Sequence, residues 1–383
     1  MSKLPQPIPR QALRDLLPDV PQTVFSEEFT RACEVLDAFV GDCLCFLVHE
    51  LSLGGFAGTA EDFARLRGHS PHGLALSRWL FDCLRLYGLA EEQDGIVHVP
   101  ATVPRVDLEA AFAAAVAASP QAEPAMAVQK LATQALPDVL AGKTTGEEAL
   151  FSLSQLDLWF SYFSNRNIHY APTNTLAALA LARAVGPQAR LLELGGGGGS
   201  AAEAALRALA DAGKPPALYV FTEVHPAFLR RGSRLVRQLL PEGCQLEARP
   251  YDIELAPEEQ GLSGVLFDAV FAVNVLHLAS DVVSALQRLR TLLAPGGALV
   301  LGELMRPSFQ APVHLELPFL LLKSYQQAKN QDGIRSRPGF LCQEGWQNAL
   351  RAAGFTDVTV LPATLDRCIA LYPGFYCAAI IAR

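Results

Sequence analysis

A histidine and a glutamate stand at positions in this sequence where they could remove a proton from a substrate. His277 follows an apolar segment, residues 267–275, that we expect to be a strand, and Glu303 lies in the next expected strand, residues 298–304. In a parallel sheet both would lie at the carboxyl edge, where ligands bind. Imidazole titrates near neutral pH, and a carboxylate beside it holds the tautomer and stabilises the imidazolium. The spacing therefore predicts a general base, His277, with Glu303 as its orienting partner.

Two other interpretations of His277 stay open. It could be an ordinary loop histidine with a satisfied hydrogen bond. It could also join Glu303 and His314 as ligands of an iron ion, but no spacing typical of metal ligands compels that set. We therefore predict no metal site.

A run of five glycines lies between an expected strand, residues 190–194, and an expected helix, residues 200–212. Glycine lets the backbone approach a ligand where a Cβ would clash. Near the ends of the next two expected strands, Glu223 is placed to accept the ribose hydroxyls of a nucleoside, and Asp252 to accept the exocyclic amine of an adenine. This pattern predicts a nucleoside-containing cofactor. The expected cofactor-binding residues are Glu193, Gly195, Gly197, Gly199, Glu223, Asp252 and Asn274.

These segments together resemble the class I S-adenosylmethionine-dependent methyltransferases, over roughly residues 166–383. The stretches that carry the resemblance are LELGGGGGS, FTEV, YDIE, FDAVFAVNVLH and LLAPGGALVLGEL. The resemblance implies S-adenosylmethionine as the cofactor and a Rossmann-like α/β fold. An NAD-binding Rossmann domain would use similar glycines, but the sequence FDAVFAVNVLH and the PGG turn before the next strand count against it.

A narrower resemblance is to the carbon-methyltransferase domains of polyketide synthases. It is carried by NVLHLASDVVSALQRLRTLLAPGG with a carboxylate after it, and by LPDVLAGK, WFSYF and EGWQNALRAAGF. In those domains the histidine removes an α-proton from a β-ketoacyl thioester and the glutamate supports it, which implies these roles for His277 and Glu303. The sequence shows no ketosynthase, acyltransferase or carrier segment. We therefore expect a small-molecule acyl substrate or one bound to a separate acyl-carrier protein.

The first 105 residues resemble the dimerisation domain of small-molecule O-methyltransferases, which implies a homodimer. That family also uses a histidine at this position, to deprotonate a hydroxyl, so the two resemblances agree on His277 and differ on the atom that is methylated. A methyltransferase fold without transfer activity is a third alternative. An enolate would need a hydrogen-bond donor at its oxygen. The candidate donors, just before the first strand, are Tyr162, Asn165, His169 and Tyr170.

The elements that must position these residues divide the chain into three expected parts. Residues 1–105 begin with a proline-rich arm, residues 106–165 form a helical connector or lid, and residues 166–383 alternate strands and helices as in a doubly wound parallel sheet. The first part has the order of a winged-helix module, with helices expected at 26–51, 59–67 and 70–87 and a hairpin at 91–99. Such modules often bind DNA, but the helix that would read DNA here carries few basic or amide side chains, so we predict no nucleic-acid binding.

The composition excludes several classes of protein. The chain has 383 residues, a formal net charge of −8, 50% apolar residues and a mean hydropathy of +0.21. It is too apolar for a disordered chain, its apolar runs are too short to cross a membrane, and its start lacks a signal-peptide core. Eight scattered cysteines without a CxxC pair fit reduced thiols, so we predict a cytoplasmic protein.

One basic stripe stands out in this acidic chain. It lies on the expected helix after Glu223 and consists of Arg230, Arg231, Arg234 and Arg237. Such a stripe could meet an acidic acyl-carrier protein by electrostatic steering, or it could simply be a solvated helix face.

Overall fold

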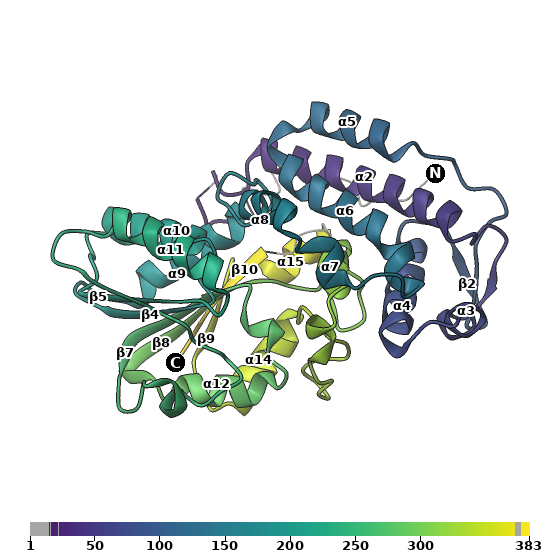
Figure 1. Cartoon of the computed structure of the whole chain (residues 1–383). Helices are drawn as coiled ribbons and strands as arrows, with labels where there is room; N and C mark the ends of the chain where they lie inside the picture. The colour runs from purple at the N-terminus through teal and green to yellow at the C-terminus, as the bar shows by residue number, and fades with distance from the viewer. Residues whose placement is uncertain (1–14, 16, 22, 372–376) are drawn as a thin grey trace.

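The structure is a computed structural model, and it describes residues 15, 17–21, 23–371 and 377–383. It has the α/β fold class predicted from the sequence, with a seven-stranded sheet preceded by a mainly helical region. Figure 1 shows the long helices α2 (Glu27–Glu50), α5 (Leu108–Ala118) and α6 (Glu123–Leu140) side by side, apart from the sheet. Most of the predicted proline-rich arm lies outside the described residues.

The first part of the chain forms the predicted helices and hairpin. After α2 come β1 (Ala57–Gly58), α3 (Ala60–Arg67), α4 (Pro71–Leu86), β2 (Glu91–Gln93) and β3 (Ile96–His98). Thr59 and Asp62 form a capping box at the start of α3, because each side chain accepts a hydrogen bond from the other residue's backbone N–H. The Ser70 hydroxyl accepts from the Gly73 N–H and caps α4. The hairpin also pairs with β1, so the small sheet has the order β1-β3-β2.

Within residues 106–165, α5 and α6 pack against α2, and the later helices pack against α6. Beyond α5 and α6 they comprise α7 (Gly146–Leu150), α8 (Leu156–Tyr162) and short 3-10 turns η1 (Pro120–Ala122) and η2 (Leu153–Gln155). Phe39 of α2 and Met126 of α6 belong to one hydrophobic cluster, which also contains Leu321 from much later in the chain. The core is therefore continuous across residue 105, and the expected boundary there stays a prediction.

The large sheet has the strand order β6-β5-β4-β7-β8-β10-β9. Its strands are β4 (Arg190–Leu194), β5 (Leu218–Thr222), β6 (Gln245–Arg249), β7 (Phe267–Val273), β8 (Leu293–Leu304), β9 (Val358–Leu361) and β10 (Cys377–Ala382). β4 to β8 pair in parallel, whereas β10 is antiparallel to both β8 and β9. The prediction of a parallel sheet is wrong at this edge, because β10 inserts between β8 and β9 and runs antiparallel to both.

The predicted PGG turn lies inside β8 rather than before it. Phe267 pairs with Leu293 and Ala269 pairs with Ala298, so the register shifts across a bulge that contains this turn. Gly296 has a φ of +79°, a conformation that suits glycine. The bulge explains why the strand begins earlier than expected, while Glu303 still lies at its carboxyl end.

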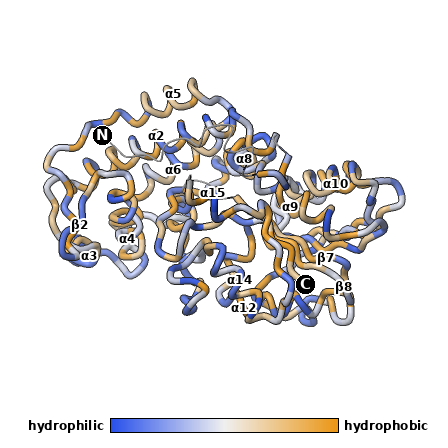
Figure 2. The backbone as a smooth tube through the Cα atoms, turned by 180° about the vertical axis from the view of Figure 1, so that it is seen from behind, coloured by the Kyte–Doolittle hydropathy of each residue, from blue (hydrophilic) through white to orange (hydrophobic). Residues whose placement is uncertain are grey.

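Helices cover both faces of the sheet. Figure 1 shows α9, α10 and α11 on one side and α12 and α14 on the other. Figure 2 shows hydrophobic residues concentrated in the strands between these layers, near β7 and β8. None of the helices formed by the described residues is both long enough and apolar enough to cross a membrane. The bounds are α9 (Ala171–Ala184), α10 (Ser200–Asp211), α11 (Pro226–Leu239), η3 (Pro257–Gln260), η4 (Leu276–Leu278), α12 (Val282–Arg290), η5 (His314–Glu316), α13 (Leu317–Leu320), η6 (Ser324–Gln327), α14 (Gln343–Ala352) and α15 (Leu365–Leu371).

Candidate active site

The glycine run forms a tight turn between β4 and α10, at the carboxyl edge of the sheet. Gly195 and Gly197 have φ angles of +55° and +54°, which L side chains rarely adopt. A Cβ on Gly195 would lie 2.6 Å from Cγ2 of Val275, so a side chain there would displace the loop after β7. At Gly197, none of the described residues has an atom within 4 Å of an added Cβ. The turn therefore presents bare backbone on an open face.

A cavity of about 590 Å³ opens at this turn, and we call it the first cavity. Its volume is within the range typical of small-molecule sites. Residues of β7 and the loops after β4, β5 and β6 line one side, and residues 319–327 line part of the other. The predicted cofactor-binding residues in its lining are Gly195, Gly197, Glu223, Asp252 and Asn274.

Glu223 and Asp252 present carboxylates to the first cavity. Glu223 Oε2 accepts from the Gly197 N–H at 3.0 Å and Oε1 accepts from the His225 N–H at 2.8 Å, which fixes the carboxylate against the glycine turn. Asp252 Oδ1 accepts from the Glu254 N–H at 2.9 Å. Each carboxylate oxygen can accept a further hydrogen bond. Acceptors beside bare backbone fit a ligand that carries hydroxyls and an amine, as a nucleoside does.

Glu193 and Gly199 lie behind the turn rather than at its open face. Glu193 is buried in β4, and its Oε2 accepts a hydrogen bond from the Tyr219 hydroxyl at 3.0 Å. Burial raises the pKa of Glu193 to about 8, although the bond from Tyr219 opposes the rise. Gly199, with a φ of +92°, is the N-cap residue of α10. Both positions shape the turn, and neither belongs to the described lining of the first cavity.

The structure brings His277 and Glu303 into direct contact. His277 Nδ1 lies 2.7 Å from Glu303 Oε2, and Glu303 Oε1 accepts from the Leu276 N–H at 3.2 Å. The side chains are only 5% and 0% exposed. Because an ionised carboxylate can only accept, Nδ1 carries the shared proton and Nε2 is left to take another. The pair thus has the geometry of a general base and its orienting carboxylate.

The imidazole ring lies just behind the wall of the first cavity. Its centroid is 4.8 Å from that of Phe340 and 6.0 Å from that of Tyr325. Tyr325 lines the first cavity, as do Asn274 and Leu278, which flank the histidine along the chain. His277 itself is absent from the described lining. The Tyr325 ring is therefore the nearest described aromatic group that both faces this cavity and contacts the base.

Arg335 holds the turn that carries the base. Its guanidinium donates to the His277 carbonyl at 2.9 Å and to the Ala279 carbonyl at 3.2 Å. Burial lowers the pKa of Arg335 to about 10. This buried cation fixes the main chain of η4, and with it the direction of the imidazole.

Of the four predicted hydrogen-bond donors, Tyr170 lies in the described lining of the first cavity. Burial raises the pKa of Tyr170 to about 12, and the Asn274 amide beside it opposes this rise. The phenol is therefore protonated at neutral pH and can donate. Asn274 is itself fixed, because its Oδ1 accepts from the Leu304 N–H at 2.9 Å.

The other three predicted donors lie elsewhere. Tyr162 is buried in an aromatic cluster. Asn165 donates to the Ser200 carbonyl at 2.8 Å and so holds the start of α10. His169 packs against Phe29, and burial lowers its pKa to about 4. The described lining of the first cavity does not include these three side chains, because each contacts other parts of the protein instead.

A second buried polar group was not singled out from the sequence. Glu316 Oε1 accepts from Arg306 Nη2 at 2.8 Å, from the Tyr325 hydroxyl at 3.1 Å and from the Phe340 N–H at 2.9 Å. Tyr325 and Phe340 are the two rings that flank His277. The one sequence signal was a glutamate set among apolar residues in HLELPFL.

His314 does not join the proton-transfer pair. Its Nδ1 lies 3.3 Å from the Tyr87 hydroxyl and 3.7 Å from Asp37 Oδ1, both in the first part of the chain. Burial lowers the pKa of His314 to about 3. Within the described ranges, no three His, Cys, Asp or Glu side chains are grouped so that they could hold a metal ion.

The basic stripe on α11 is exposed along its length. Arg231 lies over the Phe160 ring, with 4.1 Å between its guanidinium carbon and the ring centroid. Such a contact leaves the charge available to solvent. The stripe lies on the helix that follows Glu223, and therefore on the same βα unit as the first cavity.

Residues 192–299 match the family model described as a methyltransferase domain. The lovastatin diketide synthase mokB of Monascus pilosus is 33% identical over 197 residues, which are 50% of this chain and 7% of the synthase. The chain thus spans less than a tenth of that relative. The matched residues contain the glycine turn, Glu223, Asp252 and His277.

Two solved structures share the fold over nearly the whole chain. The CurJ carbon methyltransferase is 22% identical, with a TM-score of 0.74 over 97% of this chain and 96% of that chain. The trans-methyltransferase CalH, solved in complex with SAH, is 21% identical, with a TM-score of 0.62 over 91% and 90%. The resemblance stated from the sequence is confirmed: residues 192–299 match the methyltransferase domain model, and the chain shares its fold with a carbon methyltransferase.

Proposed function

We propose that this protein is an S-adenosylmethionine-dependent methyltransferase of polyketide-type biosynthesis that methylates the α-carbon of a β-ketoacyl thioester. The observation that carries the proposal is the 2.7 Å contact between His277 Nδ1 and Glu303 Oε2, beside a cavity with acceptors for a nucleoside. A phenol and the α-carbon of a β-ketothioester are both acidic enough for such a base. The similarity to a polyketide synthase favours the carbon acid.

The chain's own residues supply proton removal and positioning. Glu303 holds the Nδ1–H, so His277 Nε2 takes the α-proton and Glu303 stabilises the imidazolium that results. The Tyr170 phenol, which is protonated at neutral pH, would donate to the developing enolate oxygen. Arg335 keeps the base in place by holding the His277 carbonyl.

The cofactor would lie in the first cavity. Glu223 would accept the ribose hydroxyls, Asp252 would accept the adenine amine, and the backbone at Gly195 and Gly197 would approach the remainder. Bound there, S-adenosylmethionine supplies a methyl group whose bond to sulfur breaks, with its electron pair left on sulfur, as the enolate carbon forms the new C–C bond.

The carrier and assembly predictions extend this proposal. An acyl-carrier protein with an acidic surface would bring the substrate, guided by the α11 stripe. A homodimer formed through the first 105 residues and a cytoplasmic location stay predictions. Each can be tested without knowledge of the substrate.

The test is incubation of the protein with S-adenosylmethionine and a short β-ketoacyl thioester, read by mass shift and then by NMR. A new C–CH₃ signal is the expected result. An O–CH₃ signal, from the thioester's enol or from a phenol panel, would instead support the O-methyltransferase alternative. Cofactor binding without any transfer would support a non-enzymatic scaffold. His277→Ala is expected to lower the rate of transfer by about 10²- to 10⁴-fold while calorimetry shows that cofactor still binds.

A further inference from the structure

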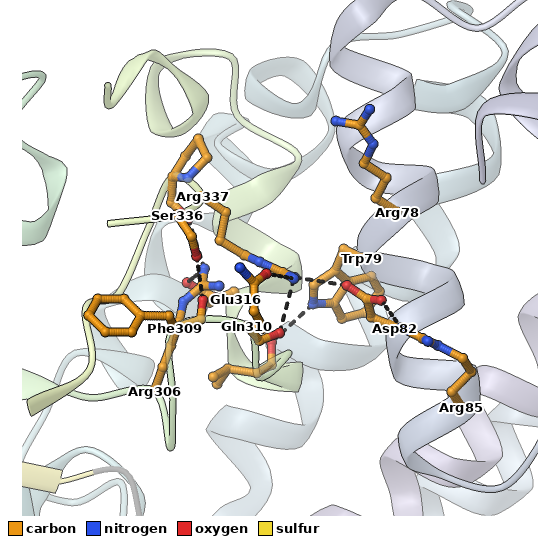
Figure 3. A network of polar contacts seen from close by, with 12 residues as sticks. Arg78, Trp79, Asp82, Arg85, Arg306, Phe309, Gln310, Glu316, Ser336 and Arg337 are labelled. Carbon is orange, nitrogen blue, oxygen red and sulfur yellow. Dashed lines mark hydrogen bonds and ion pairs between the residues drawn. The ribbon is translucent and has the colours of Figure 1, made fainter. Parts of the chain in front are cut away.

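A second cavity, of about 450 Å³, lies where the first part of the chain meets the segment after β8. Figure 3 shows its walls: α4 contributes Arg78, Trp79 and Asp82, and the facing segment contributes Arg306 and Arg337. Trp79 Nε1 donates to the Val313 carbonyl at 3.0 Å, and Arg337 Nη1 lies 2.9 Å from Asp82 Oδ2. These contacts hold the walls together.

The floor of the second cavity is formed by Arg306 and Glu316. They are 2% and 0% exposed, and they pair through Nη2 and Oε1 at 2.8 Å. Among the described residues, Arg306 Nε and Nη1 and Glu316 Oε2 have no hydrogen-bond partner. Buried polar atoms without partners are costly, so they mark a place where a ligand could add hydrogen bonds. The floor thus offers two spare donors and one spare acceptor.

The charges around the rest of this cavity are balanced. Arg78 pairs with Glu61 at 2.7 Å, and Asp82 pairs with both Arg337 and Arg85. The side chains of Arg78 and Glu61 are 58% and 52% exposed, so the rim of the cavity is open to solvent whereas its floor is buried. A lining whose cations are already paired favours a neutral ligand rather than an anion. That ligand needs carbonyl oxygens for Arg306 and an N–H or O–H for Glu316.

Only a thin wall separates the two cavities. Phe319, Leu322 and Tyr325 line the first cavity, whereas Leu320 and Gln326 of the same segment line the second. The Tyr325 hydroxyl donates to Glu316, so one side chain connects the lining of the first cavity to the floor of the second. The same ring contacts His277. The base therefore contacts the same tyrosine that hydrogen-bonds to the floor of the second cavity.

We propose that the second cavity binds the pantetheine-type arm of an acyl thioester, with Arg306 donating to an amide carbonyl and Glu316 accepting from an amide N–H or hydroxyl. This arm is neutral between its two ends and carries amides and a hydroxyl along its length. The acyl end would extend past Tyr325 into the first cavity, so that its α-carbon lies between His277 and the methyl group of the bound cofactor. The inference rests on the proposed function, since it assigns the second half of that substrate.

The experiment measures binding of pantetheine itself, without an acyl group, to the full chain by calorimetry. Ala75 lines the second cavity on α4 and is only half-buried, so Ala75→Phe would occupy part of the space and leave the residues of the buried pair unchanged. We expect wild type to bind pantetheine and Ala75→Phe to weaken binding by about tenfold or more, as loss of buried hydrogen bonds implies. Ala113→Phe, on the exposed surface of α5, is the matched control and should bind as wild type.

A second variant examines the floor directly. Replacing both partners, Arg306→Met with Glu316→Gln, avoids leaving a buried charge unpaired. It should lose pantetheine affinity to the same degree as Ala75→Phe, while circular dichroism and cofactor binding report an intact fold. Unchanged pantetheine binding in Ala75→Phe would overturn the proposal. Binding of inorganic phosphate but not pantetheine would also overturn it, because the cavity would then be an anion site.

Methylation of a short thioester is measured in parallel. If that thioester is not methylated but pantetheine binds and responds to Ala75→Phe as expected, the proposed reaction fails and the arm site stands. If the short thioester is methylated but pantetheine binding is absent from wild type, the reaction stands and the arm site is wrong.

Discussion

The two cavities are built in different ways, although they meet at one tyrosine. The first is formed at the ends of successive strands, where a glycine turn and two carboxylates lie within about sixty residues of sequence. The second joins α4 to a segment more than two hundred residues later, and its charges pair mainly with one another. A site at a sheet edge is therefore visible as motifs, whereas a site between packed parts appears only once the chain has folded.

The largest effect is expected from removal of His277, the proposed base, which lies beside the first cavity and contacts the tyrosine that connects the two cavities. His277→Ala should lower turnover by about 10² to 10⁴-fold, because general-base catalysis is worth that much. S-adenosylmethionine and pantetheine should bind as in wild type, since His277 is outside both described linings. Steady-state kinetics and calorimetry on one preparation measure this. Turnover that survives with both ligands bound would show that another group removes the proton.

Glu303→Gln keeps the shape of the orienting side chain and removes its charge. We expect a smaller loss of turnover than for His277→Ala. The reason is that the carboxylate holds the Nδ1–H and stabilises the imidazolium formed when the base takes a proton, whereas a neutral amide lacks the charge. Turnover that is equal in wild type and Glu303→Gln, measured by steady-state kinetics, would contradict the orienting role.

Acid should destabilise the fold that holds both cavities, through two buried histidines. The pKa of His169 is lowered to about 4 and that of His314 to about 3, from 6.5. Between pH 6.5 and these values the unfolded chain binds more protons than the folded chain, so stability falls as pH falls. For His169 the loss amounts to about 3 kcal/mol at pH 4. His314 contacts Tyr87 and Asp37 in the first part of the chain.

The measurement is urea unfolding from pH 7 to pH 4.5. His169→Gln and His314→Gln should flatten the pH dependence of the free energy of unfolding. Equal slopes in wild type and both variants would show that these two histidines do not control acid stability.

Glu223→Gln should weaken cofactor binding about tenfold, since a charged acceptor is replaced by a neutral amide beside the glycine turn. Pantetheine binding should not change. Asp252→Asn should have a weaker effect, because Asp252 accepts from one backbone N–H whereas Glu223 accepts from two. Calorimetry with S-adenosylhomocysteine checks both. A loss of pantetheine binding in Glu223→Gln would mean that the two cavities are not independent.

The smallest expected effect concerns the basic stripe. Arg234→Glu with Arg237→Glu should lower kcat/KM for an acidic carrier-protein substrate about three- to tenfold at low salt, with less effect at high salt. The matched substrate is the pantetheine thioester, which lacks the acidic protein surface and should react equally with both proteins. Equal loss for both substrates would indicate a local structural effect instead of steering.

Site residues at the ends of neighbouring strands could be predicted from the sequence, whereas contacts between segments far apart in the chain could not. The glycine turn, Glu223, Asp252 and the pairing of His277 with Glu303 follow from strand order, because residues at the carboxyl ends of parallel strands share one edge. Asn165 and His169 were grouped with Tyr170 by proximity in sequence, but their side chains point to different neighbours. The role of Arg306 and Glu316 became visible only in the structure, where Glu316 accepts hydrogen bonds from Arg306, Tyr325 and the Phe340 backbone. No short sequence pattern predicts these contacts.

The position of β10 has a consequence for how the protein is made. Glu303 pairs across the sheet with Ala378, and β10 is synthesised roughly seventy residues after β8. A growing chain on the ribosome can therefore complete the glycine turn and the strands around it while the strand that bears Glu303 still has an open edge. Open edges invite pairing with other chains. Shielding by a chaperone would matter most in that interval, which ends when β10 takes its place.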